Sequence, residues 1–226
     1  QAVLERRLEA EWNRRQLKMR FAAPGGLLEF IRYFWDVLEP VTPFVDGWAL
    51  DAVCAHLEAV TDGRIKRLLM NVCPGFTKSM TTDAFWPAWE WGAKGMASNR
   101  YVSFSYSASL TERDNNRFRD LMVSPKFQAM YGDRFSLVKI GETRVSNSKT
   151  GWKFASSSEG VGTGERGDRV CYDDPHNVKD GESEIIRERT VRFFKEAMSN
   201  RLNDLTKSAI IVIMQRVNEY DVSGAI

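Results

Sequence analysis

The sequence predicts an α/β fold in which a mostly parallel β-sheet is flanked by helices. Short apolar segments alternate along the chain with longer helical segments, the pattern of strands joined by helical crossovers. Residues 208–214 include Ala-Ile-Ile-Val-Ile, the most β-branched run of the chain, which is typical of a parallel strand buried on both faces. With 226 residues, 43% of them hydrophobic, the chain is long enough to form one substantial core.

The first quarter of the chain is predicted to be helical. Residues 1–20 are charged and carry a weak apolar stripe, which indicates a solvated amphipathic helix or, alternatively, an interaction arm. Pro24-Gly25-Gly26 ends this segment. The next expected elements are helices at 27–38 and 46–60 and a strand at 65–72.

The rest of the chain continues the alternation. A helix is expected at 79–93, and Pro87 within it predicts a kink or a break. The later expected elements are a strand at 101–107, a helix at 109–123, strands around a polar turn in 136–156, a short apolar strand at 170–172, a long helix at 182–202 and the strand at 208–214.

Composition excludes several classes of protein. The net charge of +2 implies that any nucleic-acid contact is local. Cys54, Cys73 and Cys171 are odd in number and far apart, which favours buried thiols in a reducing compartment over disulfides or zinc. No apolar run approaches the ~20 residues of a membrane span, so we expect a soluble intracellular protein.

The segment Cys73-Pro74-Gly75-Phe76-Thr77-Lys78-Ser79 has the order that a phosphate-binding loop needs. The preceding strand fixes the loop, whose backbone N–H groups and following helix face the anion. Lys78 would contact the β- and γ-phosphates, and Ser79 would ligate Mg²⁺. Val72 and Thr77 stand where the usual pattern has glycine, so alone this segment also fits an ordinary strand–helix turn.

Two acids follow the apolar segment 170–172. Asp173 and Asp174 would lie at the carboxyl end of a strand, where α/β sheets bind ligands. Asp173 would hold Mg²⁺ through water, and Asp174 would orient or deprotonate the attacking water. Alternatively, Asp-Asp-Pro simply begins a turn.

Two further candidates accompany the loop and the acids. Gln215 and Arg216 follow the 208–214 strand, and an amide there can sense the γ-phosphate; otherwise both are polar residues at a strand end. Arg166 lies in the glycine-rich loop 160–167. An exposed arginine there can reach a phosphate bound by a neighbouring subunit, or it is simply a surface residue.

The spacing of these motifs indicates which type of phosphate-binding fold the chain adopts. Lys78 and Asp173 are 95 residues apart, with at least one predicted strand between them. This gap favours ATPases of the additional-strand, RecA-like type over small GTPase-type folds, and the paired acids favour the same group.

Taken together, the chain resembles the N-terminal ATPase domain of the tailed-phage terminase large subunit, the DNA-packaging motor. The similarity covers about residues 27–224. The matching stretches are Gly47-Trp48-Ala49-Leu50, Ile65 to Ser79, Ser105-Tyr106-Ser107-Ala108, Gly162 to Asp168, Cys171 to Pro175, Val212 to Arg216 and Asp221 to Gly224.

The resemblance assigns roles to particular residues. It implies that Lys78 and Ser79 bind ATP·Mg²⁺ and that Gln215-Arg216 is the ATPase-coupling motif, although relatives often have threonine at the Gln215 position. It implies an arginine that acts in trans, Arg166 or, second, Arg169. The resemblance also identifies Asp173 and Asp174 with the acids of the family. Relatives often have Gly-Lys where this chain has Thr77-Lys78, which questions the loop's conformation more than its function.

The resemblance also implies an assembly. Residues 1–26 would form a helical arm and residues 27–226 the ATPase domain; the chain ends before the family's nuclease domain, so no nuclease activity is expected. A homo-oligomeric ring, commonly a pentamer, would act in the host-cell cytoplasm with the portal protein, the small terminase subunit and double-stranded DNA. Candidate DNA contacts are Arg113, Arg117, Arg119 and Lys149. Trp35, Phe44 and Trp48 are candidate adenine contacts, with core packing as the alternative that we expect for at least two of these three.

Two rival hypotheses stay open. The same core also serves helicases and other nucleic-acid remodelling enzymes. A non-enzymatic assembly subunit with a decayed loop would account for Val72 and Thr77.

Overall fold

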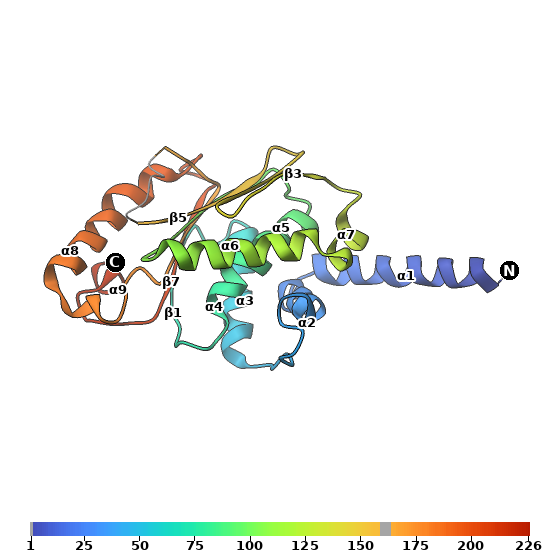
Figure 1. The fold of residues 1–226 in the computed structure, drawn as a ribbon, viewed down its shortest axis with the longest axis horizontal. Helices are drawn as coiled ribbons and strands as arrows, with labels where there is room; N and C mark the ends of the chain where they lie inside the picture. The colour runs from blue at the N-terminus through green and yellow to red at the C-terminus, as the bar shows by residue number, and fades with distance from the viewer. Residues whose placement is uncertain (1, 159–163) are drawn as a thin grey trace.

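The computed structural model describes residues 2–158 and 164–226, and its centre is a seven-stranded β-sheet (Figure 1). In spatial order the strands are β1 (Arg67–Asn71), β7 (Ala209–Met214), β6 (Arg169–Asp173), β2 (Arg100–Ser105), β5 (Trp152–Ser157), β4 (Arg144–Asn147) and β3 (Leu137–Ile140). The first five run parallel to one another, and β4 and β3 add an antiparallel edge. The predicted mostly parallel α/β fold is confirmed.

Helices cover both faces of this sheet. The α-helices of the described residues are α1 (Ala2–Ala22), α2 (Gly26–Leu38), α3 (Trp48–Thr61), α4 (Lys78–Met80), α5 (Trp86–Gly92), α6 (Ala108–Val123), α7 (Pro125–Tyr131), α8 (Glu184–Phe193) and α9 (Val222–Ala225). One apolar cluster joins α2, α3, α5, α6 and α7 to the sheet. A second cluster joins the opposite face to residues 191–202, which include the end of α8.

Strand β7 shows why the sequence signal for this sheet is strong. Its alternate residues Ile211 and Ile213 belong to one apolar cluster, whereas Ile210 and Val212 belong to the other. All six residues of the strand are buried. A strand that lies in the middle of a parallel sheet and is covered on both sides needs an unbroken apolar run.

The predicted helices at 79–93 and 182–202 are interrupted. Between α4 and α5 the chain forms a π-helix, Thr81–Phe85, directly before Pro87 at the start of α5. Pro87 has no N–H to donate, so the regular helical ladder cannot continue through it. After α8, a π-helix (Phe194–Met198) and a 3-10 helix (Ser199–Arg201) replace the rest of the predicted long helix. The 136–156 region forms the three strands β3, β4 and β5.

Helix α1 projects from the body of the molecule (Figure 1). Leu4, Leu8 and Trp12 are exposed on it, whereas Phe21 near its end is buried and accepts a 2.7 Å hydrogen bond from the Trp89 indole through its carbonyl oxygen. The predicted division into an arm of residues 1–26 and a domain of residues 27–226 stays a prediction. Over the described part of the chain, no helix combines the length and the apolar character that crossing a membrane requires.

Candidate active site

A pocket of about 290 Å³ lies at the carboxyl ends of four adjacent strands. The phosphate-loop candidate follows β1, Gln215 follows β7, Asp173 ends β6 with Asp174 directly after it, and Tyr106 follows β2. The residues that line it are Pro74, Gly75, Lys78, Ser79, Tyr106, Leu110, Arg113, Asp173, Asp174, His176, Asn177, Val178 and Gln215. Tertiary structure therefore brings the loop, both acids and Gln215 to one place.

The loop between β1 and α4 is anchored to the sheet at its start, because Val72 donates a 2.8 Å backbone hydrogen bond to Met214. Gly75 (φ +87°) and Thr77 (φ +53°) both have left-handed backbone conformations. Within the described residues, nothing accepts a hydrogen bond from the backbone N–H groups of residues 75–79. Unpaired backbone N–H groups in a turn that contains left-handed residues can form a nest for an anion.

Thr77 stands where the usual loop has glycine, and the structure shows the consequence. Its left-handed backbone costs a residue with a Cβ atom about 1–2 kcal/mol. Among the described residues, the Thr77 hydroxyl bonds only to the neighbouring carbonyl of Phe76, at 2.8 Å. The loop thus adopts a glycine-like conformation without the glycine. Cys73 and Phe76 belong to this loop but are exposed to solvent and do not line the pocket.

Lys78 and Asp174 face each other across the pocket. The Lys78 Nζ lies 2.7 Å from Asp174 Oδ2, and only 7% of Lys78 is exposed. The backbone N–H of Gln215 donates to Asp174 Oδ1 at 3.1 Å, and Asp174 itself has φ +42°. Strained backbone of this kind occurs mainly where a surrounding structure holds a functional side chain in place.

Asp173 is the most deeply buried acid of the pocket. Its Oδ1 atom has no hydrogen-bond partner among the described residues. Burial raises the pKa of Asp173 well above the usual range, and the nearby charges of Asp83 and Asp174 raise it further, whereas a hydrogen bond from the Ser79 hydroxyl lowers it. A buried, unpartnered carboxylate oxygen beside a second oxygen donor and other acids has the chemistry of a site for a hard cation such as Mg²⁺.

The side chains of the adjacent residues Gln215 and Arg216 lie in different places. Gln215 lines the pocket. Arg216 instead points into the following turn, where its Nε bonds Asp221 at 3.1 Å and its Nη2 bonds the Asn218 carbonyl at 3.1 Å. The structure therefore does not bring Arg216 to the pocket with Gln215.

The two candidates for a trans-acting arginine differ in exposure. Arg166 is exposed, in the segment that leads into β6; part of the predicted glycine-rich loop, residues 160–163, lies outside the described residues. Arg169 is buried in β6 and its Nη2 lies 2.9 Å from Glu90 Oε1. This burial makes Arg169 unavailable to a neighbouring subunit, so the second choice for the trans role is wrong.

The candidate adenine contacts also separate. Trp35 and Phe44 pack edge-to-face with ring centroids 5.3 Å apart, and the Trp35 indole donates to the Thr42 carbonyl at 2.7 Å. Both are therefore tied to the core packing. Trp48, at the start of α3, is 81% exposed and remains free to contact a ligand.

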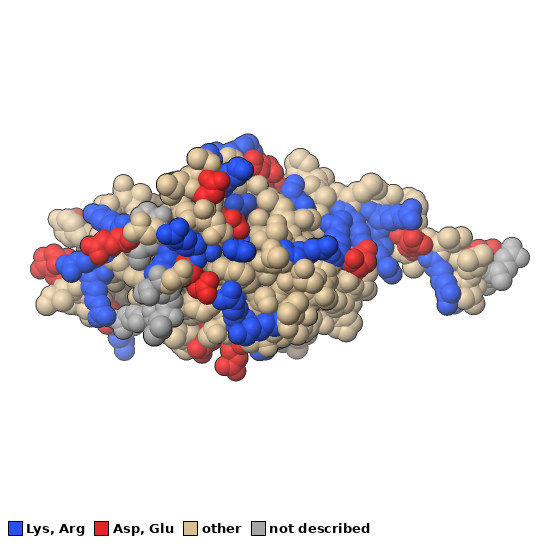
Figure 2. Space-filling view, turned by 90° about the horizontal axis from the view of Figure 1, so that it is seen from above, with Lys and Arg blue, Asp and Glu red and all other residues tan. Residues whose placement is uncertain are grey.

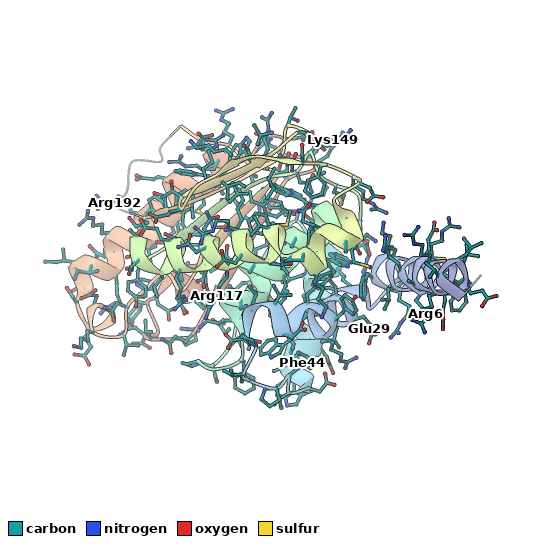
Figure 3. The ribbon with its side chains drawn as sticks, turned by 45° about the vertical axis from the view of Figure 1, so that its right-hand side comes forward. Arg6, Glu29, Phe44, Arg117, Lys149 and Arg192 are labelled. Carbon is teal, nitrogen blue, oxygen red and sulfur yellow. The ribbon has the colours of Figure 1, made fainter. Side chains whose placement is uncertain are left out.

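Of the candidate DNA contacts, Arg113, Arg117 and Arg119 lie on α6, whereas Lys149 lies in the turn between β4 and β5. Arg117 lies along α6 and Lys149 beside the antiparallel edge of the sheet (Figure 3). Arg117 bonds Asp114 at 3.0 Å and Arg119 bonds Asp120 at 2.8 Å, while Arg113 lines the pocket described above. Figure 2 shows lysines and arginines gathered most densely where α1 leaves the body, interspersed with acids elsewhere.

Sequence reasoning missed several residues of the pocket wall. Leu110 and Arg113 of α6 and the segment His176-Asn177-Val178 line it without having been assigned to it. Little in the sequence indicates these residues, because each lies a helical turn or a loop beyond the end of a strand. The motif Ser105-Tyr106, noted without a role, marked the correct strand end.

The fold and this pocket define a class of protein. Strand β7 lies between the loop strand β1 and the acid strand β6 in space, as the additional-strand prediction requires, although the inserted strand is 209–214 and not 101–107. The chain therefore has the strand order of an additional-strand α/β fold, with helices on both faces of a mostly parallel sheet.

Comparison with solved structures gives the same architecture. The chain is similar to the HK97 bacteriophage large terminase, with 17% identity and a TM-score of 0.57, over 88% of this chain and 39% of that protein. It is also similar to a mutant ATPase domain of the Thermus phage P74-26 large terminase, with 12% identity and a TM-score of 0.52, over 83% of this chain and 71% of that one. No family model matches the chain, and no curated protein matches it by sequence. The fold is that of the ATPase domain of phage large terminases.

Proposed function

We propose that this chain is the ATP-hydrolysing motor domain of a viral terminase large subunit, which drives double-stranded DNA into a procapsid. One observation carries the proposal. A loop with unpaired backbone N–H groups, a buried lysine and two strand-end acids converge on one pocket, in a fold shared with phage large terminases.

Each residue of the pocket would have a separate role in ATP hydrolysis. The N–H groups of residues 75–79 would hold the phosphates, and Lys78 would leave Asp174 to contact the β- and γ-oxygens. Asp174, released from Lys78, would orient or deprotonate the attacking water. Ser79 and Asp173 would hold Mg²⁺, which when bound neutralises charge that develops on the transferred phosphoryl group.

The proposed assembly is a ring of copies, commonly five, with DNA in its channel. The portal protein and the small terminase subunit are its proposed partners, in the cytoplasm of the host cell. Exposed Arg166 would reach the nucleotide of the adjacent subunit, where an arginine accelerates phosphoryl transfer by several orders of magnitude in other systems.

The direct test is ATP binding and hydrolysis by the purified chain with Mg²⁺, compared with Lys78→Ala. We expect the wild type to bind ATP, and Lys78→Ala to bind it at least about tenfold more weakly, because a charge-assisted contact is lost. A folded wild-type chain that does not bind ATP·Mg²⁺ at millimolar concentration would contradict the proposal and favour an assembly subunit with a decayed loop. Hydrolysis that is coupled to strand separation would favour a helicase instead.

The role of Arg166 has a separate test. Subunits carrying Arg166→Ala have an intact pocket, and subunits carrying Lys78→Ala have an intact arginine. We expect a mixture of the two variants to recover part of the lost ATPase activity at concentrations where subunits associate. Absence of any recovery there would remove Arg166 from the mechanism and leave the pocket assignments standing.

A further inference from the structure

Arg113 is a second cation of the pocket that neither the loop nor the acids account for. It lies one helical turn after Leu110 on α6, and both side chains line the pocket, as residues spaced by three on a helix share a face. Helix α6 follows strand β2 in the chain. In the sheet, β2 lies on one side of the acid strand β6, and the loop strand β1 lies on the other. Arg113 therefore approaches the pocket from the wall that faces the phosphate loop.

The guanidinium of Arg113 is held in a fixed orientation. Its Nε donates to Asp114 Oδ1 at 3.0 Å and its Nη2 donates to Oδ2 at 2.8 Å. The Asp114 side chain is only 5% exposed, so this fork is anchored to a buried group. The Nη1 group donates to no acceptor among the described residues, and the Arg113 side chain is 47% exposed. An anchored arginine with free donors is prepared to bind an oxyanion.

The charges that line the pocket show where an anion could bind. Its charged lining residues are Lys78, Arg113, Asp173 and Asp174, and Lys78 is paired with Asp174. Because β6 and its acids lie between the loop strand β1 and the strand β2 that leads into α6, a polyphosphate bound against the loop would meet Lys78 and the acids before Arg113. The group that reaches this far is the last phosphate of the chain, since the preceding phosphates lie against the loop.

We propose that Arg113 binds the terminal phosphate of the nucleotide within its own subunit and thereby lets the site distinguish ATP from ADP. This inference rests on the proposed function, and it assigns to Arg113 a role different from that of Arg166, which acts on a neighbour. It also removes Arg113 from the candidate DNA contacts. Arg117, the other arginine bonded to Asp114, does not line the pocket and has no such role.

The test compares the binding of two nucleotides, ADP and the slowly hydrolysed analogue ATPγS, each with Mg²⁺, by titration calorimetry. We expect Arg113→Ala to weaken ATPγS binding about tenfold or more, the equivalent of one charge-assisted hydrogen bond, and to change ADP binding less than about twofold. Arg113→Lys keeps the charge but loses the fork to Asp114, so it should recover only part of the difference.

Arg117→Ala is the matched control, because it also removes one bond to Asp114. We expect it to leave the ratio of the ATPγS and ADP affinities unchanged. Circular dichroism and thermal unfolding check that each variant folds, and Arg113→Gln replaces the alanine variant if that one does not. Asp114 keeps Arg117 as a partner in every Arg113 variant.

The outcomes separate this inference from the proposed function. If the wild type binds neither nucleotide, both fail together. If the wild type binds both but Arg113→Ala weakens them equally, or weakens neither, the pocket assignment stands and the role of Arg113 is overturned. The role of Arg113 would also be overturned if Arg117→Ala lost the preference for ATPγS over ADP. The preference would then depend on Asp114 and the helix instead of on Arg113.

Discussion

The two ends of strand β6 carry charged residues that behave differently. At its start, Arg169 pairs with Glu90 at 2.9 Å, and neither side chain is more than 6% exposed. Glu90 also accepts hydrogen bonds from Asn99, at 3.1 Å, and from the Tyr101 hydroxyl. At the other end, Lys78 pairs with Asp174 beside a pocket, and the adjacent Asp173 keeps a buried oxygen without a partner.

The difference separates a structural charge cluster from a binding site. Around Glu90 the polar atoms are satisfied by neighbouring side chains, so the cluster needs no ligand. Around Asp173 the donors and charges are incomplete, and an incomplete buried polar network is costly unless something else completes it. Substitutions at Asp174 and Glu90 test this distinction, and changes at Thr77 and His176 examine the loop and the pocket wall.

Asp174→Asn should have the largest effect on activity. The amide keeps the shape and one acceptor oxygen but cannot take a proton, so we expect turnover to fall about 10²–10⁴-fold while ATP binding persists. Steady-state hydrolysis and nucleotide titration measure the two quantities. Retention of more than a tenth of the wild-type turnover would show that Asp174 is not the base.

Glu90→Gln should instead affect stability. It leaves the Arg169 guanidinium buried without its counter-charge, which costs about 3–5 kcal/mol of unfolding free energy. Urea denaturation measures this cost, and turnover per folded molecule should be unchanged. Glu29→Gln, which breaks surface pairs with Arg20 and Arg32, is the control and should cost less than about 1 kcal/mol. Equal losses in the two variants would contradict the comparison.

Thr77→Gly and Thr77→Ala examine the loop. Glycine tolerates the left-handed backbone at residue 77 and alanine does not, so the glycine variant should be the more stable by about 1 kcal/mol. Thermal unfolding of the two variants gives the difference. A more stable alanine variant would mean that residue 77 does not hold this conformation in solution.

His176 gives the smallest effect, through pH. Its Nε2 accepts a 3.0 Å hydrogen bond from the Val222 backbone N–H, and burial holds the pKa of His176 below its usual value of 6.5. Below pH 6.5, His176 therefore binds a proton in the unfolded chain more readily than in the folded chain. Stability should fall as the pH drops from 6.5, with a slope of at most about 1.4 kcal/mol per pH unit. Urea unfolding of the wild type and of His176→Gln between pH 7.5 and 5.5 isolates this slope, which the variant should lack; equal slopes would contradict it.

Local sequence predicted the elements well where one strong signal acted. The apolar run of β7, the Asp-Asp pair at the end of β6 and the Lys78-Ser79 dipeptide after β1 each identified a strand end correctly. The prediction was poorer at 182–202, where helical periodicity continues through Phe194–Met198 although the chain widens there into a π-helix. Periodicity reports which side chains are buried and does not distinguish such turns.

The sequence by itself determined the strand–helix alternation and the chemistry available at each strand end, because both follow from local side-chain patterns. Only the tertiary structure decided which ends meet. It placed β7 between β1 and β6, buried Arg169 against Glu90, turned Arg216 towards Asp221 and brought Arg113 to the pocket. The physical reason is that strand order and helix packing depend on contacts between segments far apart in the chain, which no local pattern contains.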